Sequence, residues 1–145
     1  AYRVVGSADD AREVCQNVFL KVYQGLGSFN GSHPFYSWIY RITVNEALNF
    51  LGRRHSAEHI DSMEIESPAL RPDQDCEKNE MQLHMQAALD TLSPDYRVVI
   101  VLKHFLGCTY QEMAQILQVP EKTIKSRLFT ARQLLKQLLV QKGIM

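Results

Sequence analysis

Residues 109–135, TYQEMAQILQVPEKTIKSRLFTARQLL, constrain the fold most, because they contain two helical patterns separated by only a few residues. Thr109 and Glu112 have the spacing of a capping box, which begins a helix. The segment QVPEK ends that helix and begins a second one. Two helices joined so closely must cross at a sharp angle and bury their apolar faces against each other and against further helices. The pattern therefore predicts an all-α domain of the helix-turn-helix type.

The second helix of this pair separates apolar from basic residues. Its apolar face is predicted to comprise Ile124, Leu128, Ala131, Leu135 and Leu138. The remaining surface has one acid, Glu121, against the bases Lys122, Lys125, Arg127, Arg132 and Lys136. Such a helix fits the DNA major groove and neutralises phosphates. A helical bundle with a solvated, charged face is the alternative interpretation.

Residues 7–56 predict two further helices. Ser7 is a suitable N-cap with Asp10 three residues later, and the helix that follows should end near Gly25 to Gly27. The polar segment GSFNGSHP predicts a loop, because Pro34 disfavours helical geometry at the preceding residue. A second helix then runs from Phe35 to the basic segment GRRHS. The first helix is expected to bury one apolar face, made of Val14, Cys15, Val18, Phe19, Val22, Tyr23 and Leu26.

An acidic segment separates the two halves of the chain. Residues 57–80 carry eight acidic and two basic residues, whereas residues 1–56 carry six basic against four acidic and residues 81–145 eight against four. With two prolines and little periodicity, residues 57–80 are predicted to be a flexible linker. We therefore expect two small helical domains, residues 1–56 and 81–145. In the second, Ser93 and Pro94 begin a helix that stops at Gly107, although the β-branched residues within it leave a strand possible.

Aromatic, amide and basic side chains gather at the start of the second helix. Tyr36 and Tyr40 lie beside a polar loop, a composition suited to stacking unpaired bases. Phe35 and Trp38 fall on the apolar stripe, so we expect these two in the core. The nucleic-acid contacts expected in this module are mainly polar, and come from Phe29, Asn30, Gly31, Ser32, Arg41, Asn45, Asn49, Arg53 and Arg54.

Composition argues against several other classes of protein. No apolar run is long enough for a membrane span, and the N-terminus lacks the features of a secretory signal, so a cytoplasmic location is expected. The three cysteines are widely spaced and suggest reduced thiols. His55, His59 and Cys76 could form a metal site, but a His-x-x-x-His step in a polar segment is more typical of solvated histidines. No phosphate loop or nucleophile motif is present, so we expect no catalytic residue, cofactor or metal.

Both halves together resemble a known family. The segment DDAREVCQNVFLKVYQGLGSFNGSHPFYSWIYRITVNEALNFLGRR resembles the second conserved region of bacterial extracytoplasmic-function sigma factors. The segment ALDTLSPDYRVVIVLKHFLGCTYQEMAQILQVPEKTIKSRLFTARQLL resembles their fourth region. The joint presence, order and spacing of the two segments are more specific than either alone. Relatives carry a further helical segment before the position of Ser7, where this sequence has only AYRVVG, so we expect it to lack the most N-terminal part of the second region.

The resemblance implies a dissociable subunit that binds core RNA polymerase and directs it to promoters. The helix at residues 8–26 would dock on the clamp helices of the largest subunit, and the fourth region would contact the flap of the second largest. Asn17 stands where an acid is common in the family. The polymerase contacts implied are Glu13, Gln16, Asn17, Phe19 and Lys21.

The same resemblance implies that residues 28–50 open the minus-ten element and capture a flipped base of the non-template strand. The last helix would enter the major groove of the minus-thirty-five element, with Lys103 and Tyr110 as contacts to the DNA backbone. Thr130 stands where relatives often carry Arg, so the base preference there should differ. The implied contacts of this helix are Lys122, Thr123, Lys125, Ser126, Arg127, Phe129, Thr130 and Arg132.

An anti-sigma factor is the further partner that the resemblance implies. Such a partner is often anchored in the membrane, so a bacterial cytoplasmic protein of this kind can be held at the inner membrane face without inserting itself. A stand-alone helix-turn-helix regulator is the alternative function. The absence of a ligand motif, and the amides and aromatics of residues 35–50, argue against it.

Overall fold

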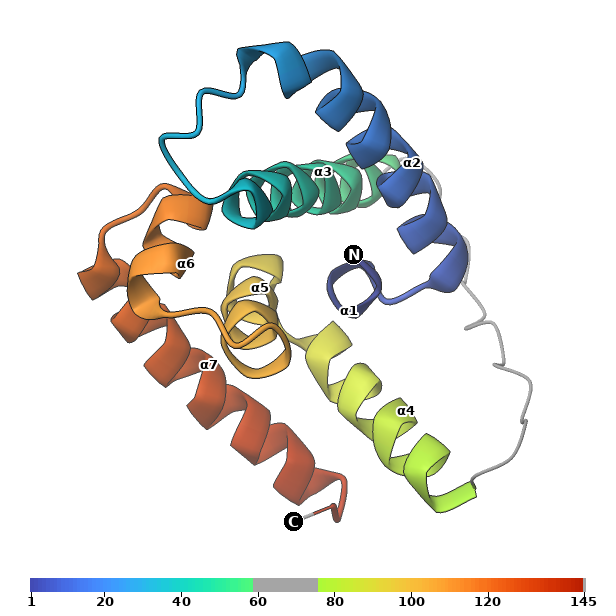
Figure 1. The fold of residues 1–145 in the computed structure, drawn as a ribbon. Helices are drawn as coiled ribbons and strands as arrows, with labels where there is room; N and C mark the ends of the chain where they lie inside the picture. The colour runs from blue at the N-terminus through green and yellow to red at the C-terminus, as the bar shows by residue number, and fades with distance from the viewer. Residues whose placement is uncertain (59–75, 145) are drawn as a thin grey trace.

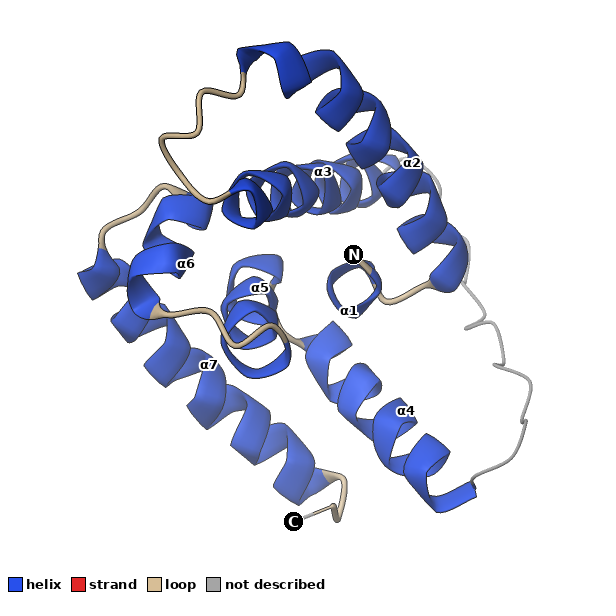
Figure 2. Cartoon of the chain, viewed as in Figure 1, coloured by secondary structure: helices blue, strands red, loops and turns tan. Residues whose placement is uncertain are grey.

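The computed structural model describes residues 1–58 and 76–144, and within these ranges every regular element is helical (Figures 1 and 2). The all-α prediction is confirmed, and the strand considered between residues 98 and 105 is wrong. In chain order the elements are α1 (Tyr2–Val5), α2 (Ala8–Gly25), the 3₁₀ turn η1 (Leu26–Ser28), α3 (Phe35–Glu58), α4 (Cys76–Thr91), α5 (Pro94–Ile100), the π-helical segment η2 (Val101–Phe105), α6 (Tyr110–Leu117) and α7 (Glu121–Gln141).

The boundaries of the first module follow its local chemistry. The Ser7 hydroxyl accepts a hydrogen bond from the backbone N–H of Asp10 at 3.4 Å, which caps α2 as predicted. The loop before Pro34 leads into α3, where the carbonyl of Pro34 accepts from the N–H groups of Ser37 and Trp38. α3 continues past the predicted GRRHS end to Glu58.

The buried face of α2 is narrower than predicted. Val14 and Val18 are buried together with Ala11, but Phe19, Tyr23 and Leu26 are 73%, 82% and 51% exposed. Their assignment to the core is therefore wrong. α3 and the short α1 cover only one strip of α2, and no described element covers the next strip around the helix (Figure 1). The exposed apolar row of α2 therefore consists of Phe19, Leu20 and Tyr23, and Leu26 at the start of η1 continues it.

The predicted linker lies mostly outside the described residues. Of residues 57–80, the first two belong to α3 and the last five to α4, so both helices extend into the predicted segment. Residues 59–75 are not described, and His59 of the considered metal site is among them. Within the described ranges, no three His, Cys, Asp or Glu residues are placed to hold a metal ion.

The second module is built around the helix-turn-helix of α6 and α7. The capping box is confirmed, since Thr109 Oγ1 accepts from the Glu112 N–H at 3.2 Å and Glu112 Oε2 accepts from the Thr109 N–H at 2.7 Å. Gln118, with φ of 54°, makes the turn between the helices. Ile124, Leu128 and Ala131 of α7 are almost completely buried, as predicted.

The two modules share a single apolar core. α3 packs against α5 and α6, and α1 lies between α2, α4 and α5 (Figure 1). Buried residues at this junction come from both sides, including Val4 and Val44 from the first module and Val98 and Leu102 from the second. The described halves of the chain are therefore in direct contact.

Candidate nucleic-acid interface

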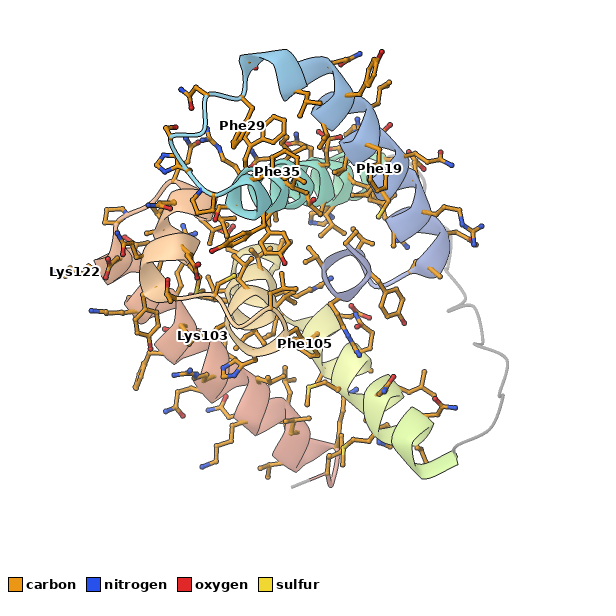
Figure 3. The ribbon with its side chains drawn as sticks, in the orientation of Figure 1. Phe19, Phe29, Phe35, Lys103, Phe105 and Lys122 are labelled. Atoms are coloured by element: carbon orange, nitrogen blue, oxygen red, sulfur yellow. The ribbon has the colours of Figure 1, made fainter. Side chains whose placement is uncertain are left out.

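The first half of α7 presents the predicted DNA-binding side chains. Thr123, Arg127 and Thr130 are partly buried along its flanks. Phe129 is 67% exposed although it is aromatic, which leaves its ring free to contact a ligand. Lys122 lies at the outer end of the helix (Figure 3). The exposed members of the predicted set are Lys122, Lys125, Ser126, Phe129 and Arg132.

A cationic group surrounds Tyr110 at the start of α6. The ammonium nitrogens of Lys103 and Lys125 lie 4.8 and 5.6 Å from the centre of the Tyr110 ring. Lys103 also donates a hydrogen bond to the carbonyl of Cys108 at 3.2 Å. The structure thus brings together Lys103 and Tyr110, predicted as backbone contacts, with Lys125 of the predicted recognition helix.

Arg132 forms a hydrogen bond with His104, a residue that the sequence pattern did not indicate. Its Nε donates a hydrogen bond to His104 Nε2 at 3.2 Å. The pKa of His104 is lowered from its ordinary value, first by burial and then by the positive charges of Arg132 and Lys103. The lowered pKa favours the neutral imidazole, which is the form that can accept this bond.

The loop before α3 and the first turns of α3 line most of an open cavity of about 140 Å³. Phe29, Asn30, Ser32 and Arg41, all predicted nucleic-acid contacts, line it. Asn30 Oδ1 accepts from the N–H of Ser32 at 3.0 Å, and Gly31 between them has φ of 70°, a conformation that favours glycine. The other lining residues are Ser28, His33, Ser37, Trp38 and Gln115.

Two aromatic rings, Phe29 and Trp38, line the apolar side of this cavity, and Phe35 packs against both of them. The centre of the Phe29 ring lies 5.3 Å from that of Phe35 and 5.2 Å from that of Trp38 (Figure 3). Phe35 is 44% exposed and Trp38 is only half-buried, so the prediction that these two belong to the core is wrong. Phe29 of the loop, and not another helix, packs against Phe35 and Trp38 at the start of α3.

The remaining predicted contacts of α3 lie outside the cavity. Asn45 and Asn49 follow Arg41 at steps of four residues, so they lie on the same side of the helix, and both are exposed. Arg53 is exposed five residues before the end of α3. Arg54 donates to Asp10 Oδ2 at 2.8 Å and so ties α3 to the start of α2. The helix therefore extends a polar strip beyond the cavity.

The predicted polymerase contacts all lie on α2. Glu13, Gln16, Phe19 and Lys21 are exposed and Asn17 is partly buried. Lys21 forms an ion pair with Glu46, a buried residue of α3. The sequence did not predict that the apolar row of α2 is exposed. Helical periodicity shows that a helix has an apolar face, but it does not show whether the same chain or a partner protein covers that face.

Comparison with known proteins places these features in a family. The model of sigma-70 region 2 matches residues 1–57, and that of sigma-70 region 4 matches residues 83–135. The RNA polymerase sigma-H factor of Pseudomonas aeruginosa is 33% identical over 142 residues, which are 90% of this chain and 74% of that protein. The ECF RNA polymerase sigma-E factor of Escherichia coli is 36% identical over 135 residues, 86% of this chain and 71% of that protein.

Two solved structures have a similar fold. The sigma factor RpoE in complex with the anti-sigma factor NepR, from Bartonella quintana, has a TM-score of 0.78 and 29% identity, covering 95% of this chain and 86% of that one. CnrH in complex with the cytosolic domain of CnrY has a TM-score of 0.69 and 24% identity, covering 97% and 78%.

The two modules and their matched regions define a transcription initiation factor of the sigma-70 class. Within that class, the chain belongs to the ECF sigma factors. In the described ranges, no helix combines the length and the apolar character that crossing a membrane requires.

Proposed function

We propose that this chain directs core RNA polymerase to promoters by binding DNA at two places, one with each module. Residues 1–56 would bind the polymerase and the minus-ten element, residues 57–80 would act as the linker, and residues 81–145 would bind the minus-thirty-five element. One observation carries the proposal: a cavity lined by aromatic, amide and guanidinium groups on the first module accompanies an exposed basic recognition helix on the second. We propose no catalytic activity for the chain itself.

The cavity of the first module would hold one unpaired base of the non-template strand. Phe29 and Trp38 provide flat apolar surfaces, and Asn30 and Arg41 provide hydrogen-bonding groups. Extruding a base costs a few kcal/mol, which stacking and hydrogen bonds in a shaped cavity would offset. Asn45, Asn49 and Arg53 would contact the strand beside that base, because they continue the same polar strip of α3.

α7 would lie in the major groove of the minus-thirty-five element. Lys125, Ser126 and Phe129 are exposed on the side away from the buried face, where they would meet base edges. Lys103 and Tyr110 would contact the phosphates flanking the groove. The short side chain of Thr130 cannot make the bidentate contact to guanine that an arginine makes, so we expect a different base preference at that position.

The exposed apolar row of α2 would dock on the clamp helices of the largest polymerase subunit. Phe19 lies in this row, and Gln16 and Lys21 lie beside it. A row of this size left uncovered on a small module is typical of a protein-binding surface. The 81–145 module would contact the flap of the second-largest subunit.

An anti-sigma factor would control the protein, and in the bacterial cytoplasm such a partner could hold the chain at the inner membrane face. The similar RpoE structure, with its bound NepR, supports this part of the proposal. We expect the partner to protect residues 8–26 and the first half of α7 from hydrogen exchange. Equal exchange of both segments with and without the partner would contradict this expectation.

Run-off transcription tests the proposal directly. The full-length protein and core polymerase would be given a promoter library with randomised upstream and downstream elements, with core polymerase alone as the control. We expect transcripts only with the protein, from promoters that share two motifs at a fixed spacing. Tight binding of duplex DNA without polymerase, and no transcripts, would instead indicate a stand-alone regulator.

A further inference from the structure

The surface between the two modules is apolar at its centre. Val4 of α1 and Val44 and Ala47 of α3 face Val98, Val101 and Leu102 of the second module, and all six line one small cavity. Each of these side chains is at least nine-tenths buried. Separating the modules would expose them to water, which is unfavourable. The chain therefore has a physical reason to keep its modules together.

Polar contacts close one edge of this surface, at α1. Arg3 Nη1 donates to Gln86 Oε1 of α4 at 3.2 Å, and Arg97 of α5 donates to the carbonyl of Val4. Gly6 has φ of 83°, and a Cβ there would come within 2.7 Å of Asp90 Oδ1. The left-handed backbone conformation favours glycine at this position, next to the Asp90 carboxylate of α4. α1 therefore packs against α4 and α5 of the second module as well as against α2 and α3 of the first.

A second set of contacts closes the opposite edge, at the cavity proposed to hold a base. The Tyr36 hydroxyl of α3 donates to Glu112 Oε1 of α6. Glu112 uses its other oxygen, Oε2, for the capping box, so the two roles are separate. Gln115, one turn further along α6, lines the cavity together with Arg41. The helix-turn-helix module therefore supplies part of the wall of the first module's cavity.

We propose that the helix-turn-helix module is a built-in cover for the base cavity, and that the free chain rests in this closed, autoinhibited state until its modules separate on the promoter. The consequence for DNA rests on the proposed function. Elements centred about 25 base pairs apart lie roughly 85 Å apart on B-form DNA. A compact chain of 145 residues has a radius of gyration of only about 15 Å. The closed chain cannot reach both elements, so opening must precede or accompany promoter binding.

A similar arrangement is present in a sigma factor bound to its anti-sigma factor. The NepR-bound RpoE superposes on nearly the whole of this chain, both modules included. In this chain the arrangement is held by its own contacts. An inhibitor of this protein would then need only to stabilise a state that the free chain already occupies, which requires less binding energy than imposing a new one.

Two substitutions each weaken one edge of the interface between the modules and leave the capping box and the apolar core unchanged. Tyr36→Phe removes only the hydroxyl that binds Glu112, and Arg3→Met removes the guanidinium that binds Gln86. Tyr23→Phe is the matched control, because Tyr23 is exposed on α2 away from the second module. Each hydrogen bond removed should shift the balance between closed and open chains about three- to tenfold.

Spin labels on the full chain measure the closure itself. The labels would be placed by Gln24→Cys on α2 and Gln133→Cys on α7, both exposed, after Cys15→Ser, Cys76→Ser and Cys108→Ala. We expect one narrow distance distribution for the parent chain and for Tyr23→Phe. Tyr36→Phe with Arg3→Met should add a broad population at longer distance. A broad distribution in the parent chain, or identical distributions in all variants, would overturn the proposal.

Binding of single-stranded DNA measures whether the cavity is covered. Trp38 is the only tryptophan and lines the cavity, so its fluorescence reports binding of a pool of single-stranded 12-mers with randomised centres. The double variant removes two hydrogen bonds, so it should bind the pool about ten- to a hundredfold more tightly than the parent chain or Tyr23→Phe. If the parent chain, Tyr23→Phe and the double variant bind the pool equally tightly, and Arg41→Ala weakens binding in each, the proposal that the second module covers the cavity is overturned. Binding insensitive to Arg41→Ala would instead contradict the proposed base cavity, and the distance measurement would still decide the closure.

Discussion

Lys125 and Arg127 carry the most specific residue-scale prediction for DNA binding. Replacing both with Ala should weaken binding to a minus-thirty-five duplex by about 1–3 kcal/mol for each base edge that these side chains no longer bind. If one of them binds a phosphate, the slope of affinity against salt should fall by about one. Fluorescence anisotropy at several salt concentrations measures both quantities.

Lys136→Ala is the matched control, because it removes the same charge from a later turn of α7. Its effect should be smaller than that of Lys125→Ala. Equal weakening by the substitutions at Lys125 and Lys136 would indicate a general charge effect and contradict a specific recognition face.

His104 gives the module a pH dependence whose direction follows from its environment. Its pKa is lowered by burial and by the positive charges of Arg132 and Lys103, so the unfolded chain takes up a proton at a higher pH than the folded one. The stabilising contribution is therefore fully present above the ordinary histidine pKa and is lost as the pH falls through the lowered one. Protonation also removes the acceptor for Arg132.

Urea denaturation between pH 5 and pH 8 tests this prediction. His104→Gln should flatten the pH dependence, since an amide can accept from Arg132 without titrating in this range. His84→Gln, an exposed histidine of α4, serves as the control and should leave the dependence unchanged. An unchanged slope in His104→Gln would exclude this role for His104.

At the scale of single elements, the capping box decides where α6 begins. Thr109→Ala removes the hydroxyl that caps the Glu112 N–H and should cost about 1 kcal/mol of unfolding free energy. Thr91→Ala removes a hydroxyl that bonds only within α4 and should cost less. Equal unfolding free energies for Thr109→Ala and the parent chain in urea would show that the capping box contributes nothing.

Shortening a side chain should affect polymerase binding on the exposed side of α2 and folding stability on its buried side. Phe19→Ala should change the unfolding free energy by no more than about 0.5 kcal/mol, since Phe19 is largely exposed, but should weaken binding to core polymerase. Val18→Ala, one residue away and buried, should cost about 2 kcal/mol of stability and leave the polymerase-binding surface in place. The reverse pattern in denaturation and polymerase-binding assays would disprove the assignment of these faces.

Local chemistry made most helix boundaries predictable, but not the faces that helices bury. Ser7, Pro34, Pro94 and the Thr109 capping box each act within a few residues, so they are visible in the sequence. Burial of Phe19 or Phe35 depends on which distant element packs there, and periodicity carries no such information. Phe35 and Trp38 were misassigned to the core for this reason.

The contact between the modules is a property of the whole molecule that no local pattern predicts. Tyr36 and Glu112 are far apart in the sequence yet form a hydrogen bond, and Arg41 and Gln115, similarly distant, line the same cavity at that edge of the interface. Phe29, Asn30 and Ser32 of the loop line one cavity, and their contact with DNA stays a prediction. Gln115 and His104 were missed, and Tyr36 was expected to stack on bases rather than to bind Glu112, because these contacts arise only from the packing of one helix on another.

The central claim is that each module of this sigma factor selects one promoter element. Promoter-library selection with core polymerase tests it most directly when the parent protein is compared with Arg41→Ala and with Lys125→Ala plus Arg127→Ala. We predict that Arg41→Ala changes base preferences only in the downstream motif, and that the α7 variant changes them only in the upstream motif, with the spacing conserved. Unchanged preferences, or both motifs changing together in either variant, would contradict the account.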